Sequence, residues 1–551
     1  MYTPPKQGAP FPGPGENARA FAQTRFREVG MMIRTALVTL AVGTGWLAVT
    51  ATARQQAPPP DFAARPASSV RYLKASNPGE DDRLGVGNPL IGVTIGMSAD
   101  GNTLAVSAPY ESSAATGANG NQQDESAWES GAVYVFVRTG NSWSQQAYIK
   151  ASNTQTSDKF GFSLALSGDG NTLAVGATLE DGNARGVNGN QTDNSADASG
   201  AVYVFVRNGS TWSQQAYVKA SNADAGDQFG WSVALSRDGS TLAVGAQTEG
   251  SAATGLNGDQ ADNSAADAGA VYVFARSGTA WTQQAYVKAS NAQAGDRFGF
   301  SVTLSGDGNT LAAGSYDEDG SAKGVNGASD EAAANSGAAY VYIRRGAAWT
   351  HEAYVKASNT VRNIAFGSAV ALSADGSTLA VGAVDETSLT RGIDGDQSST
   401  PDNAVSAGSI YIFGRMDGGW RQQAYVKSFN IGPTDLFGIR LALSADGSVL
   451  AAGAPGQNGG GRGFKANPED FSAPESGAVY IFRRAAGKWS QHAYVKAPNS
   501  DAYDQFGSGV ALSGNGAVLA AASNGEDGGS RGIGGNQNDN SVRDSGAIFI
   551  F

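Results

Sequence analysis

Apolar and small residues alternate along a segment that recurs throughout the chain. In the clearest copy, residues 160–177 read FGFSLALSGDGNTLAVGA, with a large apolar residue at every second position of the first half. This period of two predicts a strand with one bulky face and one thin face. The Asp-Gly pair at 169–170 predicts a tight hairpin into a second strand over 172–177. Two further apolar runs, residues 200–207 and 211–220, complete a predicted unit of four antiparallel strands.

This four-stranded unit repeats along the chain. A tyrosine in the motif YVKASN, or in a close variant of it, marks each copy and recurs about every 69 residues, at Tyr72, Tyr148, Tyr217, Tyr286, Tyr354, Tyr425 and Tyr494. A fixed period of this length is typical of repeat architectures. Four-stranded units that pack bulky face against thin face around an axis form a β-propeller. The sequence therefore predicts an all-β fold, a seven-bladed β-propeller of four-stranded antiparallel blades.

The two ends of the repeated region predict how the ring closes. Residues 69–76 (SVRYLKAS) look like the fourth strand of a unit, with no first three strands before them. Residues 545–551 look like a third strand, after which the sequence ends. We therefore expect the N-terminal strand to pair beside the C-terminal strand in one blade, because an open ring would leave unpaired sheet edges. A short insertion at residues 86–92 accounts for the longer first repeat.

The region before the repeats has a different composition. Residues 1–53 comprise an upstream extension and, at about 31–53, a predicted secretory signal with one arginine, a short apolar run and a closing Ala-Thr-Ala. A membrane anchor is the alternative, although the apolar run is short for a span. Residues 54–69 form a Pro/Ala-rich linker, and residues 70–551 form the propeller. We expect a secreted, periplasmic or cell-surface protein with no stable membrane span after signal removal.

Charge and cysteine content narrow the choice of partners. The chain carries a net charge of −12, of which residues 1–53 contribute +3, so subtraction leaves −15 for the remainder. A negative surface disfavours nucleic acid and anionic lipid as partners. The chain contains no cysteine, which excludes a disulfide framework and a thiolate metal site. We expect a monomeric propeller.

Short motifs in the units indicate a family. A Phe-Gly pair opens the first strand of six units, at Phe160-Gly161, Phe229-Gly230, Phe298-Gly299, Phe366-Gly367, Phe437-Gly438 and Phe506-Gly507, and Gly453-Ala454-Pro455 closes a second strand. The units resemble FG-GAP repeats, the blades of the integrin α-chain propeller and of its bacterial relatives. The resemblance covers residues 70–551 and implies the propeller fold. Integrin-type blades often carry a calcium loop in the first hairpin, but residues 167–172 are too short for one and lack its final Asp.

The connection between the second and third strands is unusually long and rich in oxygen ligands. In residues 177–200, the carboxylates and amides of Glu180, Asp181, Asn188, Asn190 and Asp193 form a candidate calcium loop. The alternative is that Asn, Asp and Gly only make turns and a solvated rim. Related loops carry Glu111, Asn119, Asn121 and Asp124; Asn257, Asp259, Asp262 and Asn263; Asp394, Asp396, Asp402 and Asn403; and Asn536, Asn538, Asp539 and Asn540. The corresponding loops of the fourth and sixth units do not keep this pattern of Asn and Asp residues. Equivalent loops should gather on one face of the propeller.

Other repeated positions have structural interpretations. Lys74, Lys150, Lys219, Lys288, Lys356, Lys427 and Lys496 recur once per unit, and five of them are soon followed by an Asp, which favours local ion pairs or protection of a strand edge. Trp143, Trp212, Trp281, Trp349, Trp420 and Trp489 are interpreted as packing residues of the outer strand. His351 and His492 occupy a Gln position of that strand, and a His-based triad is not expected. We recognise no residue that breaks the repeat symmetry at the centre.

These observations favour a non-enzymatic binding or adhesion module. Its long acidic loops would recognise an extracellular protein or glycan, with calcium as a candidate cofactor. The alternatives are a polysaccharide-active enzyme that uses Asp and Glu on the same face, and a lectin. A lectin would need repeated aromatic pockets between blades, whereas Trp128 and Trp231 are isolated tryptophans outside the repeated set.

Overall fold

The computed structural model describes residues 62, 69–85, 93–397 and 406–551. The chain divides into two compact units, residues 1–58 and 59–551, and only the second contains described residues. The predicted signal, nearly all of the predicted linker and the predicted insertion at 86–92 lie outside the described residues, as do Asp402 and Asn403.

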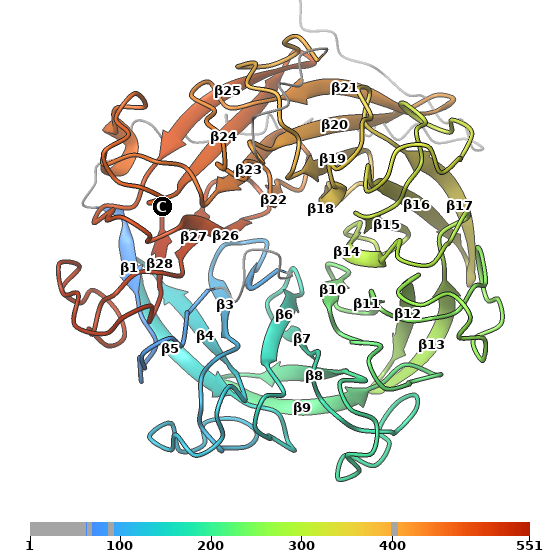
Figure 1. The fold of residues 1–551 in the computed structure, drawn as a ribbon. Coiled ribbons are helices and arrows are strands. Elements are labelled where there is room, and N and C mark those ends of the chain that lie inside the picture. Colours follow the sequence, from blue (N-terminus) through green and yellow to red (C-terminus); the bar gives the residue numbers. More distant parts are fainter. Residues whose placement is uncertain (1–61, 63–68, 86–92, 398–405) are drawn as a thin grey trace, which may run out of the picture. The chain divides into compact units, whose positions relative to one another are not determined.

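In the described part of the chain, seven four-stranded antiparallel sheets surround a central axis (Figure 1). The first four blades contain β2 (Ile95–Met97), β3 (Thr103–Ala108), β4 (Ala132–Thr139) and β5 (Ser142–Ile149); β6 (Phe160–Leu166), β7 (Thr172–Ala177), β8 (Ala201–Asn208) and β9 (Thr211–Val218); β10 (Ser232–Leu235), β11 (Thr241–Ala246), β12 (Ala270–Ser277) and β13 (Ala280–Val287); and β14 (Phe298–Leu304), β15 (Thr310–Ser315), β16 (Ala338–Arg345) and β17 (Ala348–Val355). The last three contain β18 (Phe366–Leu372), β19 (Thr378–Ala383), β20 (Ser409–Met416) and β21 (Gly419–Val426); β22 (Arg440–Leu443), β23 (Val449–Ala454), β24 (Ala478–Ala485) and β25 (Lys488–Val495); and β26 (Phe506–Leu512), β27 (Leu519–Ser523), β28 (Ala547–Ile550) and β1 (Arg71–Leu73). A 3₁₀ helix, η3 (Gly463–Lys465), lies between β23 and β24. The predicted seven-bladed, all-β fold is confirmed.

The first hairpin of each blade is held by its own side chains. In the second blade, Asp169 Oδ1 accepts a hydrogen bond from the Asn171 amide at 2.9 Å, and Ser167 Oγ accepts one from the Thr172 amide at 2.9 Å. Gly170 has a φ of 71°, a conformation that costs glycine little. The recurring Asp-Gly pair is therefore explained by turn geometry.

The first strand departs from the strict alternation expected for residues 160–167. Phe160 pairs with Ala177, but the next pair is Ser163 with Gly176, so the register shifts between them. This irregularity leaves Phe160 and Leu164 in the core between the first two blades. Phe162 lies outside that core and contacts Trp231 of the third blade instead. A bulge of this kind redirects single side chains, and here it redirects the residue after the Phe-Gly pair.

Bulky and thin faces pack together between blades, as the sequence predicts. Between the first two blades, the rings of Phe160, Tyr203 and Phe205 belong to one buried cluster with Ala105 and Val133. Phe160 meets Tyr203 edge-on, with the ring centroids 5.5 Å apart. Equivalent clusters lie at the following interfaces, so each sheet buries its bulky face on its predecessor.

The N-terminal and C-terminal strands share one sheet. β1 pairs antiparallel with β28, with Tyr72 opposite Phe549, and the sheet order is β1-β28-β27-β26. Side chains of this seventh blade, including Ile548 and Ala520, share a buried cluster with Leu104 of the first blade. The pairing expected between the two ends of the repeats is therefore present.

The repeated tryptophans pack on the outer strands, in agreement with their predicted role. Trp212 is only 3% exposed, and its Nε1 donates to Gln146 Oε1 of the preceding blade at 3.0 Å. The guanidinium carbon of Arg207 lies 5.5 Å from the centroid of the Trp212 ring. His351 and His492 lie on the outer strands β17 and β25.

The first prediction concerns the interfaces between blades. Phe229 is fully buried in the cluster between the second and third blades. Replacement by alanine should lower the free energy of unfolding by about 3 to 5 kcal/mol, because it leaves a cavity in a close-packed core. Chemical denaturation measures this loss. A loss below about 1 kcal/mol would show that this face is not packed as described.

Candidate ligand-binding face

The long connections between second and third strands begin at the same end of every blade. All blades have the same strand order, so these loops emerge on one side of the ring (Figure 1). This loop-bearing face consists of the segments between β3 and β4, β7 and β8, β11 and β12, β15 and β16, β19 and β20, β23 and β24, and β27 and β28. The expectation that the loops share one face agrees with this arrangement.

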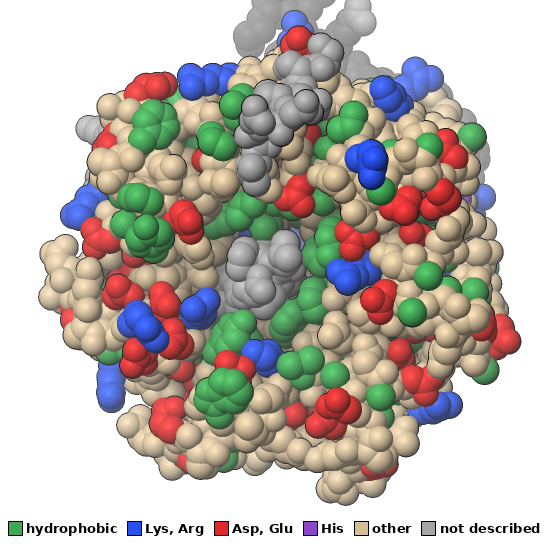
Figure 2. All heavy atoms as spheres, in the orientation of Figure 1, with side chains coloured by type: hydrophobic (Ala, Val, Ile, Leu, Met, Phe, Trp, Pro, Cys, Tyr) green, Lys and Arg blue, Asp and Glu red, His purple; other side chains and the backbone are tan. Residues whose placement is uncertain are grey.

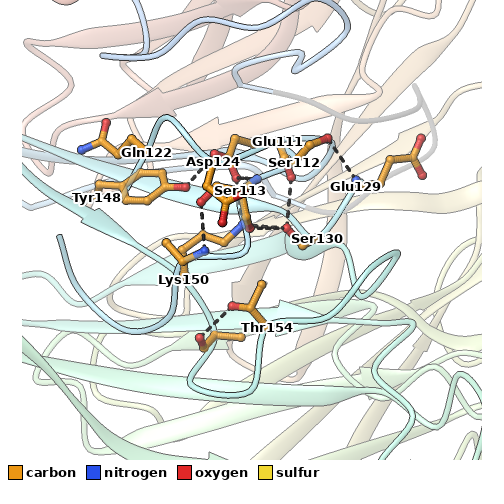
Figure 3. A network of polar contacts seen from close by, with 12 residues as sticks. Glu111, Ser112, Ser113, Gln122, Asp124, Glu129, Ser130, Tyr148, Lys150 and Thr154 are labelled. Carbon is orange, nitrogen blue, oxygen red and sulfur yellow. Dashed lines mark hydrogen bonds and ion pairs between the residues drawn. The ribbon is translucent and has the colours of Figure 1, made fainter. Parts of the chain in front are cut away.

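A buried ion pair anchors the loop to its blade in six of the seven blades described. In the first blade, Lys150 Nζ lies 2.8 Å from Glu111 Oε2 and donates to Ser130 Oγ at 2.7 Å (Figure 3). The Tyr148 hydroxyl donates to Glu111 Oε1 at 2.6 Å. Glu111 and Ser130 stand near the two ends of the loop, whereas Tyr148 and Lys150 stand at the end of the fourth strand. The contacts therefore clamp both ends of the loop to the sheet.

The same ion pair recurs in six of the seven blades described. The pairs are Lys74 with Glu526, Lys150 with Glu111, Lys219 with Glu180, Lys288 with Glu249, Lys356 with Glu318, and Lys427 with Glu386. All six lysines are fully buried. Burial lowers the pKa of Lys219, and the neighbouring Glu180 opposes that shift.

The prediction for these lysines was wrong in its details. They do not protect an exposed edge, and their partner is a loop glutamate rather than the Asp that soon follows them. The glutamate is distant in sequence, as with Glu180 and Lys219, and only the folding of the blade brings the two together.

An asparagine extends the network to the next blade. Asn153, which follows the fourth strand of the first blade, donates from Nδ2 to Glu180 Oε1 of the second blade at 3.1 Å. Its Oδ1 accepts a hydrogen bond from the Tyr203 hydroxyl at 2.5 Å. Asn222 makes the equivalent contacts with Glu249 and Tyr272. The asparagine of the repeated motif therefore connects the loop anchors of neighbouring blades.

The sixth blade differs at this network. Gln457 replaces the glutamate, and Lys496 Nζ donates to its Oε1 at 3.2 Å and to Ser476 Oγ at 2.7 Å. Burial without a paired carboxylate lowers the pKa of Lys496 to about 7.

The residues of the candidate calcium loop are used in the loop's own structure. Glu180 accepts hydrogen bonds from Lys219 and Tyr217. The other four each accept a hydrogen bond from a backbone amide: Asp181 from Ala198 at 2.8 Å, Asn188 from Tyr217 at 3.0 Å, Asn190 from Thr192 at 3.1 Å and Asp193 from Ser195 at 3.0 Å. Within the described residues, no cluster of three or more His, Cys, Asp or Glu is placed to hold a metal ion. Calcium binding stays a prediction.

The related loops repeat the asparagine contact. Asn119, Asn257 and Asp394 each accept a hydrogen bond through Oδ1 from the tyrosine amide of their blade's fourth strand, at 3.0, 3.0 and 2.9 Å. Asn188 has a φ of 57°, a conformation in which asparagine is enriched. This position therefore shapes the loop in several blades.

A second buried carboxylate lies beside the Phe-Gly pairs. Asp227 Oδ2 accepts a hydrogen bond from the Asp224 amide at 2.9 Å, and burial raises the pKa of Asp227 to about 7. Equivalent residues with raised pKa values are Asp82, Asp158, Asp296, Asp435 and Asp504. The fifth blade has Ile364 at this position, so a charge is not required there.

The repeat symmetry breaks around the centre, contrary to the expectation from the sequence. The residue after the Phe-Gly pair is aromatic in three consecutive blades, at Phe162, Trp231 and Phe300. The ring centroids of Phe162 and Trp231 are 4.8 Å apart, and those of Trp231 and Phe300 are 5.7 Å apart. Tyr316 continues the row at 4.1 Å from Phe300. Alignment of the residues after each Phe-Gly pair contains this signal, because later blades have Ser368, Ile439 and Ser508 there.

The loop anchors yield a second prediction. Glu180→Gln gives the second blade the glutamine, lysine and serine of the sixth, and should lower the free energy of unfolding at pH 7 by roughly 1 to 3 kcal/mol. A depressed lysine pKa means that the folded state binds fewer protons than the unfolded state between about pH 7 and 10. The loss should therefore shrink as pH rises through this range. Gln457→Glu is the matched control, with the opposite pH dependence; equal pH profiles for both variants would contradict this account.

The buried aspartates yield a third prediction. Asp227 retains its proton up to about pH 7 in the folded state and loses it near pH 4 when unfolded, so the stability that it contributes falls as pH rises between these values. Asp227→Asn should stabilise the protein on the order of 1 kcal/mol at pH 8, with a smaller gain at pH 5. Denaturation at both pH values measures the gain. The exposed Asp417→Asn is the control; an equal effect of both changes would contradict burial as the cause.

The comparison with protein families agrees with the repeated architecture. Three spans of the chain, residues 143–205, 212–274 and 281–342, match the FG-GAP repeat. Similar solved structures include hydrazine synthase from Kuenenia stuttgartiensis, at 14% identity over 79% of this chain and 94% of that chain, with a TM-score of 0.42. Another is the β-propeller domain of Cps50 (Swd1) from Myceliophteria thermophila, at 12% identity over 84% of this chain and 96% of that chain, with a TM-score of 0.43. No curated protein matches the chain.

Membrane-spanning helices are absent from the part of the chain that the structure describes. The regular secondary structure of the described residues is almost wholly strand, arranged in repeats that carry Phe-Gly pairs at equivalent positions. With three matched repeats and seven four-stranded blades, the chain is an FG-GAP β-propeller protein.

Proposed function

We propose that this protein is a non-enzymatic binding or adhesion module whose ligand contacts the loop-bearing face. The observation that carries the proposal is the buried lysine–glutamate clamp beneath the loops, as in Lys219 with Glu180. A rigid scaffold that holds surface loops in place is the usual arrangement of a recognition surface. Because the sequence predicts a secretory signal, we propose an extracellular protein or glycan as the ligand.

Contacts between loops and neighbouring blades support a continuous surface. Asn194 Nδ2 donates to Gln155 Oε1 at 2.6 Å, and Asn263 Nδ2 donates to Asp224 Oδ2 at 2.8 Å. Both asparagines are exposed, and Gln155 Nε2 also donates to Asn194 Oδ1 at 3.3 Å, so the amide of Asn194 is fixed in place on the surface that a ligand would meet. Fixed polar groups lose little conformational entropy on binding, which favours affinity.

The enzymatic alternative would use carboxylates on the same face. Glu180 and its equivalents are each held by a buried lysine, which is a structural arrangement and supports a non-catalytic role. Calcium assistance remains part of the proposal, and the calcium ion would bind at the exposed tips of the loops. Isothermal titration of the chelated protein with calcium tests it, and the absence of both heat and a thermal shift would exclude it.

The fourth prediction tests the face itself. The full chain is applied to a glycan array and to extracts of cell-envelope proteins, and the captured ligand is titrated. The combined change Asn194→Ala, Asp197→Ala and Asn263→Ala should weaken binding at least about tenfold if the loops contribute a central contact. Asp417→Ala, on the exposed β20–β21 hairpin at the opposite end of its blade, is the control and should leave affinity within about twofold.

Two outcomes would contradict the proposal. Equal affinity for the loop variant and the control would place the ligand elsewhere. New reducing ends released from a bound polysaccharide would favour the enzymatic alternative.

A further inference from the structure

A cavity of about 240 Å³ lies at the aromatic row of the second to fourth blades. Phe162, Trp231, Phe300 and Tyr316 form an aromatic wall. The residues that directly follow β7 and β11, together with Tyr110, Lys159 and Arg297, complete the lining. The residues after β7 and β11 begin the long loops, so the cavity lies on the loop-bearing face. Figure 2 shows hydrophobic side chains gathered around the centre of the face in view.

Three lining residues carry a buried polar atom without a hydrogen-bond partner among the described residues. These atoms are Trp231 Nε1, Thr178 Oγ1 and Gln247 Oε1. Thr178 is 1% exposed and Gln247 is 5% exposed, although Gln247 Nε2 donates to Gln228 Oε1 at 3.1 Å. Buried polar groups without partners are rare because each loses its hydrogen bonds to water without replacement. Three around one cavity indicate a hydroxylated occupant.

The charges at the cavity are already balanced. Lys159 Nζ lies 2.7 Å from Glu129 Oε2. Arg297 donates to the Tyr316 hydroxyl at 2.8 Å and lies 3.5 Å from Asp317 Oδ2. With each cation beside a carboxylate, the site offers no uncompensated charge to an ionic ligand.

We propose that this cavity binds one ring of a neutral sugar. A pyranose ring has an apolar C–H surface, which packs on aromatic side chains, and hydroxyl groups that both donate and accept hydrogen bonds. These atoms are buried in the structure, so the side chains must turn toward the cavity; one such ring can then accept from Trp231 Nε1, donate to Gln247 Oε1 and do either with Thr178. Ligand sites commonly combine an apolar wall with a few polar groups in this way. The inference rests on the proposed binding function and names a ligand class for it.

The repeats themselves supply variants that the fold tolerates. Trp231→Ser introduces the residue found at the equivalent position of the fifth and seventh blades, Ser368 and Ser508. Thr178→Val introduces the residue of the fifth blade, Val384, and removes only the unpartnered hydroxyl. The matched control is Phe471→Ser, which removes an aromatic ring that is 52% exposed on the loop of the sixth blade.

The fifth prediction uses these variants in the full chain. Methyl glycosides of glucose, galactose, mannose and N-acetylglucosamine are titrated by calorimetry and by NMR spectroscopy. The NMR resonance of the Trp231 indole N–H is identified as the one absent from Trp231→Ser. At least one neutral glycoside should shift this resonance. Trp231→Ser should then weaken binding at least about tenfold and Thr178→Val about three- to tenfold, while Phe471→Ser leaves the affinity unchanged.

Three results would overturn the sugar site: no glycoside shifts the indole resonance, both pocket variants retain full affinity, or glucuronate binds more tightly than the neutral glycosides. Thermal denaturation of each variant separates lost binding from lost folding. Failure of the sugar site can be told apart from failure of the proposed function. If only the sugar site were absent, the loops of Trp231→Ser would still capture their ligand.

Discussion

The fold depends on a charge that it buries once per blade. A lysine ammonium removed from water is stabilised when a carboxylate and further hydrogen bonds compensate it, and removal of one partner leaves a costly unpaired charge. Here Lys150 donates to Glu111 and Ser130, which come from the two ends of a loop, and Tyr148 of the fourth strand donates to the same Glu111. A blade can satisfy this lysine only when its long loop closes over the sheet. The same contact therefore specifies strand order and loop position together.

The network also explains why the blades are similar without being identical. The asparagine after the fourth strand donates a hydrogen bond to the loop glutamate of the next blade. A substitution in one blade therefore affects the loop anchor of its neighbour. Gln457 in the sixth blade still accepts a hydrogen bond from Lys496, which preserves the geometry although the carboxylate charge is lost. Ile364 in place of the buried aspartate is a different solution, because it avoids the desolvation of a charge altogether. Hydrogen-bond geometry is thus retained more strictly than charge at the loop anchors.

Symmetric and asymmetric positions have separate roles. The Phe-Gly pairs, outer tryptophans and loop anchors repeat because every blade meets its neighbours in the same way. A ligand that sits at one place near the axis touches only some blades, so its contacts need not repeat. The aromatic row at Phe162, Trp231 and Phe300 has this character, together with the unpartnered polar atoms beside it.

The sequence by itself determined the number of blades, the strands of each blade and the joining of the two ends, because these follow from the local period of two, from turn residues and from the length of the repeat. It also predicted the structural role of the outer tryptophans. It could not assign Lys219 to Glu180, since the two are far apart in the chain and a nearer aspartate offered a simpler pairing. It also missed the cavity at Trp231. The side chain of Trp231 is redirected where the first strand departs from regular pairing, and the cavity joins residues of consecutive blades. Both depend on distances across the sheet and between sheets, which only the closed ring defines.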